Sequence, residues 1–181
     1  MTEKIVTLKK YLQSLARGEL VKEIKTLHKL FPAVQEYYQI KLSDAGDGED
    51  ALLAKYKKII KNEFMPDRGF GKARLSVARK AVVDFRKIAK NKNNIADIMV
   101  YYVEMGVEFT NAYGDIDEPF YNSMGKMYDT ASQYIKQHNL TIPFMQRLRN
   151  IVTETSGIGW GFHDELGEIF HDYFPGYEER S

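Results

Sequence analysis

Apolar side chains recur every three or four residues through almost the whole chain, and this spacing restricts the fold more than any other feature. In residues 3–15, for example, Ile5, Leu8, Leu12 and Leu15 fall on one face of a helix. No stretch alternates apolar and polar side chains convincingly, as a half-buried strand does. The spacing predicts helices over residues 3–15, 19–31, 32–42, 51–64, 72–90, 94–113, 119–138, 143–155 and 160–174.

Short loops join these segments, so neighbouring helices are expected to form antiparallel hairpins. The predicted fold class is all-α, with eight or nine amphipathic helices in a solenoid-like array or a globular bundle. Both arrangements stay open, because no repeat of fixed period is found. We expect one domain over residues 1–181, with a flexible loop at about 43–50 and a loose C-terminus from about 175.

The composition excludes several classes of protein. The chain has no cysteine, so disulfides and thiolate chemistry are excluded, and a reducing cytosol fits. No apolar run approaches the roughly 20 residues of a membrane-spanning helix. Lysines interrupt the first residues, MTEKIVTLKKYL, where a signal peptide would need its apolar core. A cytoplasmic location and no membrane partner are therefore expected.

The charges are sorted along the chain. Residues 55–92 hold thirteen Lys and Arg against three Asp and Glu, whereas residues 93–181 hold five against fourteen. The basic part could follow the phosphates of a nucleic acid, or it could be a solvated helix face. The candidates for binding an anion or a nucleic acid are Arg68, Lys72, Arg74, Arg79, Lys80, Arg86 and Lys87.

The helix expected over residues 94–113 is apolar nearly all round, which is typical of a helix in the middle of a domain. Its acidic residues Asp97, Glu104 and Glu108 nevertheless align on one side. Buried carboxylates must be paired, hydrogen-bonded or protonated. The preceding helix carries many basic residues, and Arg74 is the expected partner near one end.

Two glycines and three basic residues occur in RGFGKAR, residues 68–74, where a helix is expected to begin. Free amides at a helix start can bind an anion, so this segment is either an anion site or a tight connection with a basic rim. It is not a P-loop, because position 66 is proline where that motif needs glycine.

Two further joints carry candidate ligand-binding residues. In NAYGDIDEPFYNSM, residues 111–124, the acids before Pro119 suit a helix start, although with Glu108 they could also hold a divalent cation. In TSGIGWGFHDEL, residues 155–166, alternating glycines indicate either a structural joint or a small pocket. The candidate ligand-binding residues are Asp115, Asp117, Glu118, Trp160 and His163, and the candidate metal ligands are Glu104 and Glu108.

The strings GFGKARLSVARKAVVDF, YYVEMGVEFTNAYGDIDEPFYNSM and TSGIGWGFHDEL resemble a family of small bacterial helical proteins known only as a domain of unknown function. The similarity extends from the first helix to about Phe174. It implies a wholly helical, cytoplasmic bacterial protein with no assigned activity, substrate or cofactor, and it transfers no catalytic residue.

No motif of the sequence identifies a reaction, and no cofactor is expected. The leading hypothesis is a non-enzymatic binding or scaffold protein whose partner is a protein or a small molecule. One alternative is nucleic-acid binding through the basic residues of 55–90. The other is an enzyme or metal protein that uses the acids of residues 104–118 together with His163.

Overall fold

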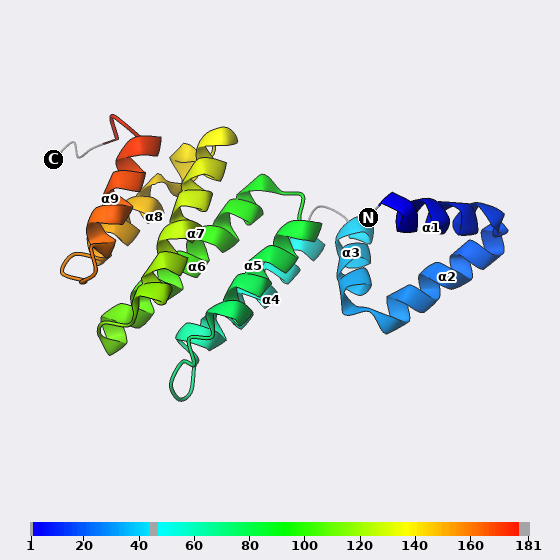
Figure 1. Ribbon diagram of the computed structural model, residues 1–181, viewed down its shortest axis with the longest axis horizontal. Coiled ribbons are helices and arrows are strands. Elements are labelled where there is room, and N and C mark those ends of the chain that lie inside the picture. The colour runs from blue at the N-terminus through cyan, green and yellow to red at the C-terminus, as the bar shows by residue number, and fades with distance from the viewer. Residues whose placement is uncertain (1, 44–46, 178–181) are drawn as a thin grey trace. The chain divides into compact units, whose positions relative to one another are not determined.

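The computed structural model describes residues 2–43 and 47–177, and every regular element in these ranges is a helix (Figure 1). The predicted all-α class is therefore confirmed. Contacts within the chain divide it into two compact units, Met1–Gly48 and Glu49–Ser181. The expectation of a single domain over residues 1–181 stays a prediction. No helix in the described ranges is both long enough and apolar enough to cross a membrane.

The N-terminal unit contains α1 (Thr2–Ser14), α2 (Arg17–Leu30) and α3 (Pro32–Leu42). The side chain of Glu19 accepts a hydrogen bond from the amide of Ala16, at 2.7 Å, and this closes the start of α2. Pro32 ends α2 and is the first residue of α3, a position where its missing N–H costs nothing.

The C-terminal unit contains α4 (Asp47–Phe64, from Glu49 onward), α5 (Leu75–Ile88), α6 (Lys92–Tyr113), α7 (Glu118–Gln137), α8 (Thr141–Glu154) and α9 (Phe162–Tyr173). Helix α6 packs against α5, α7 and α8, as its apolar sequence predicts. Met99 and Val103 of α6 have no exposed surface. In Figure 1, α5 and α9 lie in front of α4 and α8, respectively.

Aromatic side chains from three helices form the core at one end of this unit. The ring of Phe64, the last residue of α4, lies 5.7 Å from that of Tyr102, 6.0 Å from that of Phe109 and 6.2 Å from that of Phe120. The Tyr102 hydroxyl is hydrogen-bonded to Ser123 Oγ at 2.8 Å, so burial of this polar group is compensated.

Most helices begin within two residues of the predicted start, whereas α4 begins four residues earlier and α5 three residues later. Helix α4 begins at Asp47, so residues 47–50 of the predicted loop are helical, and residues 44–46 of that loop lie outside the described residues. Helices α5 and α9 begin at Leu75 and Phe162, later than expected, because the residues before them have left-handed backbone conformations. Of the C-terminus from 175, residues 178–181 also lie outside the described residues.

Candidate functional site

The loops that follow α4, α6 and α8 lie at the same end of the C-terminal unit (Figure 1). We call these three loops, residues 65–74, 114–117 and 155–161, the loop edge. The loops approach one another: the ring of Phe70 lies 5.9 Å from that of Tyr113, the last residue of α6 before the second loop. A Cβ atom at Gly159 would lie 2.9 Å from a carboxylate oxygen of Asp115. The fold therefore brings three separate glycine-containing joints of the sequence together.

The first loop is held in a defined conformation against the end of α4. A Cβ atom at Gly71 would overlap the carbonyl oxygen of Phe64, so only glycine permits this approach. Ala73 has a φ of +46°, and its amide donates to the carbonyl of Glu63 at 2.7 Å. The Arg74 guanidinium donates twice to the carboxylate of Glu63, at 2.9 and 2.6 Å. Arg74 therefore closes this loop rather than pairing with an acid of α6.

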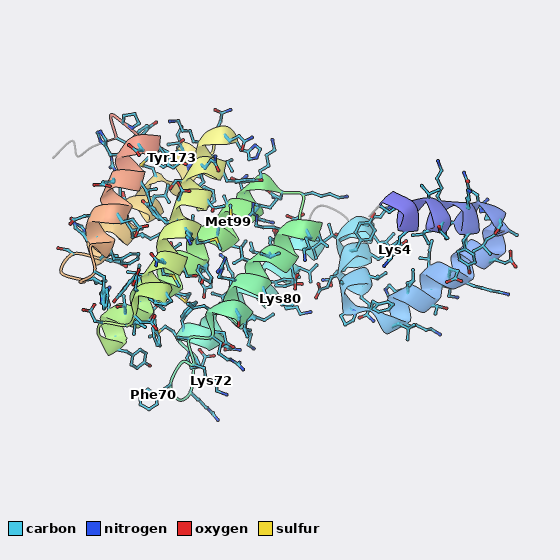
Figure 2. All side chains as sticks on the ribbon, viewed as in Figure 1. Lys4, Phe70, Lys72, Lys80, Met99 and Tyr173 are labelled. Atoms are coloured by element: carbon cyan, nitrogen blue, oxygen red, sulfur yellow. The ribbon has the colours of Figure 1, made fainter. Side chains whose placement is uncertain are left out.

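The same loop presents an aromatic ring and two basic side chains to solvent. Phe70 is 83% exposed, and Arg68 and Lys72 are exposed as well. Figure 2 shows Phe70 and Lys72 at the outer end of the loop. Beneath them is a cavity of 380 Å³, whose lining includes Arg68, Phe70, Lys72 and Asn62.

The Glu63–Arg74 pair predicts a dependence of stability on pH. Hydrogen bonds from Arg74 lower the pKa of the Glu63 carboxyl, despite the opposing effect of burial. A lowered pKa stabilises the fold above the unfolded value of about 4.3, and this contribution is lost as the pH falls through the folded value. We expect the stability difference between wild type and Glu63→Gln to shrink below about pH 4, measured by urea unfolding. A difference that grows on acidification would contradict this.

The second loop uses its acids for local structure. Asp117 accepts a hydrogen bond from the amide of Phe120 at 3.0 Å and caps α7, as its position predicts. Asp115 accepts from the hydroxyl of Tyr121 at 2.9 Å, and this hydroxyl also accepts from the amide of Ile116 at 3.2 Å. Glu118 is exposed in the first turn of α7.

The candidate residues Trp160, in the third loop, and His163, in the first turn of α9, have different surroundings. Trp160 is 63% exposed and has a φ of +63°. His163 is turned toward the end of α8, where its Nδ1 lies 3.0 Å from the Val152 carbonyl oxygen and 3.1 Å from Thr155 Oγ1. The structure thus brings Asp115 to the loop that carries Trp160, while His163 bonds to the neighbouring helix.

Two of the three aligned acids of α6, Asp97 and Glu104, are paired across helices, but the partners were predicted incorrectly. Arg147 of α8 donates to both Glu104 oxygens at 2.7 Å and to Asp97 at 2.6 Å. Lys57 of α4 lies 2.6 Å from the other oxygen of Asp97. Burial alone would lower the pKa of Arg147, but its bonds to Glu104 and Asp97 outweigh burial and raise it. These basic partners belong to α8 and α4 rather than to α5.

The candidate metal ligands Glu104 and Glu108 are one turn apart on the same side of α6, but their surroundings differ. Glu104 bonds to Arg147, whereas Glu108 is exposed one turn later on α6. Within residues 2–43 and 47–177, no three His, Asp or Glu side chains are grouped so that they could hold a metal ion.

The basic residues of α5 are partly neutralised on their own helix. Lys80 and Lys87 both pair with Asp84. Their hydrogen bonds to the Asp84 carboxyl hold its pKa below the usual value. Arg79 is exposed and Arg86 is half-buried.

The exposed ring of Phe70 was not among the candidate residues predicted from the sequence. Its position between two glycines, outside every predicted apolar face, is the signal that could have indicated an exposed aromatic side chain.

Comparison with known proteins identifies the family but no activity. The sequence model of a family of unknown function (DUF6155) matches residues 3–174, so the chain belongs to this family. No curated protein and no solved structure matches the chain.

Proposed function

We propose that this member of a family without an assigned activity is a non-enzymatic cytoplasmic binding protein, whose N-terminal unit holds an acidic amphipathic helix of a partner protein. One observation carries the proposal: α1 and α2 are amphipathic, yet none of the described apolar side chains of α1, α2 and α3 is buried. Helices in proteins are stabilised mainly by packing of their apolar faces, so these three helices need a further surface to cover them.

The exposed side chains are large and form grooves. On α2, Ile24 is 43% and Leu27 42% exposed, whereas core residues of the C-terminal unit such as Ile98 are fully buried. A groove of 720 Å³ is lined by apolar residues of the first two helices, and a second of 230 Å³ by residues of α2 and α3. The apolar residues of the larger groove are Ile5, Leu8, Leu12, Leu15 and Leu20. An amphipathic helix binds such a groove through residues spaced at i, i+3, i+4 and i+7.

The charge of the N-terminal unit favours an acidic partner. Residues 2–43 carry eight Lys and Arg against four Glu. Lys9 borders the larger groove, and Lys25 and Lys29 border the smaller one. Complementary rim charges favour an acidic helix, whereas a second copy of the same unit would bring basic rims together.

The test uses a fluorescein-labelled helical peptide of about 18 residues, with Leu on one face and Glu on the other. Its anisotropy should rise on addition of the full-length protein. Ile24→Asp should weaken binding by at least about tenfold, because it places a charge in the apolar groove. Lys25→Glu should also weaken binding and make it less sensitive to salt.

Lys10→Glu is the matched control, because Lys10 is exposed on α1 but borders neither groove. It should change affinity much less than Lys25→Glu does. A scrambled peptide of the same composition should not bind. Binding to phosphatidylserine vesicles but not to the peptide would contradict the proposal in favour of a membrane surface. A stable dimer that Ile24→Asp dissociates would contradict it in favour of a second copy.

A further inference from the structure

We infer that the cavity beside loop 65–74 binds a nucleoside phosphate, either free or within a single-stranded nucleic acid. The base would stack on Phe70, and the phosphate would lie against Arg68 and Lys72. This site is in the C-terminal unit, so it does not depend on helix binding by the N-terminal unit.

Phe70 provides the stacking surface. It is 83% exposed, and its described ring contact is an edge contact with Tyr113, at 5.9 Å between centroids and 62° between planes. An exposed aromatic ring contributes little to folding, whereas every nucleobase has a flat face that can stack on such a ring.

The charges beside this ring are available for a phosphate. Arg74 is occupied by Glu63, and Lys61 is paired with Asp67 at 2.6 Å. Within the described part of the chain, Arg68 and Lys72 form no ion pair, and both line the cavity with Phe70. Glu63 lines it too, and Lys72 adds slightly to the lowering of the Glu63 pKa, which is due mainly to Arg74. A phosphate next to an aromatic base matches two cations next to an exposed ring.

The loop is preorganised for this contact. The close approach of Gly71 to Phe64, the left-handed conformation of Ala73 and the double hydrogen bond between Arg74 and Glu63 fix its backbone. A left-handed backbone at a residue other than glycine is strained, and such strain concentrates at functional positions. Fixing the loop before binding lowers the entropy lost when a ligand is held.

The cavity has the size of a small-molecule site. Its 380 Å³ lies within the usual range for ligand pockets, roughly 300–1,000 Å³. The side-chain amide of Asn62 lines it and can donate to or accept from a base edge. A site for a bare anion would need neither the ring nor this amide.

The test measures binding of fluorescein-labelled single strands of about 12 nucleotides, poly(U) and poly(A), to the full-length protein. Phe70→Ala should weaken binding by about 5- to 150-fold, the loss expected for one base stack, and Phe70→Trp should retain it. The double variant Arg68→Gln/Lys72→Gln should reduce the salt slope of log K by about 1.4, since each contact to a single strand contributes about 0.7.

Lys80→Gln/Lys87→Gln removes the same number of charges from exposed positions of α5 outside the cavity, and should change binding little. Adenosine monophosphate is then added as a competitor. If it competes at least as strongly, per phosphate, as the unlabelled strand does, the ligand is a free nucleotide. If it competes more weakly, the ligand is a strand. Either result supports the site. The inference is overturned if neither ligand binds at low salt, if Phe70→Ala binds as wild type does, or if inorganic phosphate competes as well as the nucleotide.

Discussion

Replacement of Phe64 by alanine is expected to lower the free energy of unfolding of the C-terminal unit by about 3–5 kcal/mol. Phe64 has no exposed surface, and its ring contacts three other aromatic rings, from α6 and α7. Truncation removes its burial and leaves a cavity among large rings that cannot collapse fully. Urea unfolding followed by far-ultraviolet circular dichroism measures the loss.

Phe70→Ala is the matched control for Phe64→Ala, because it deletes the same ring from a position that is 83% exposed. Its effect on unfolding should stay within about 0.5 kcal/mol. Equal losses for the two variants would show that Phe64 is not part of a packed core. The control also ensures that the loss of nucleic-acid binding expected for Phe70→Ala is not a loss of folding.

Replacement of Arg147 by methionine is expected to cost about 2–4 kcal/mol of unfolding free energy. Removing one partner of a fully buried ion pair costs about 3–5 kcal/mol, and the lower range here reflects partial access of solvent. The side chain of Arg147 is 31% exposed, and Asp97 and Glu104 are 21% and 28% exposed. Urea unfolding at neutral pH provides the measurement.

A compensating variant distinguishes the loss of the ion pairs of Arg147 from a general loss of packing. Glu104→Gln, introduced together with Arg147→Met, should recover part of the loss, because Glu104 then carries no unpaired charge while Asp97 keeps its pair with Lys57. Lys80→Ala, which removes an exposed pair, should cost no more than about 1 kcal/mol. Strict additivity in the combined variant would contradict an ionic role for Arg147.

Periodicity predicted the helices well, because a buried face requires apolar residues at helical spacing whatever the surrounding fold. The position of α6 in the middle of its unit followed from a sequence that is apolar on nearly every side. The starts of α5 and α9 were missed because they depend on the backbone of Ala73 and Trp160. The Ala73 conformation is fixed by a bond to Glu63 in the preceding helix, and periodicity carries no information on such a contact.

The hydrogen-bond partners of the candidate site residues could not be predicted from the sequence. Helical projection aligned Asp97 with Glu104, but Arg147 is 43 positions beyond Glu104, and only the arrangement of helices shows that they meet. The sequence also singled out the three joints one by one. Their assembly into the loop edge depends on alternate helices ending at the same side of the unit.

The placement of Trp160 decides what intrinsic fluorescence can report for this protein. It is the only tryptophan, and it is 63% exposed in the third loop of the loop edge. Its indole is already hydrated in the native state, so unfolding should shift its emission wavelength only slightly. A macromolecule that covers the loop edge should instead shift the emission to the blue. The native chain thus carries a built-in optical reporter of its surface rather than of its core.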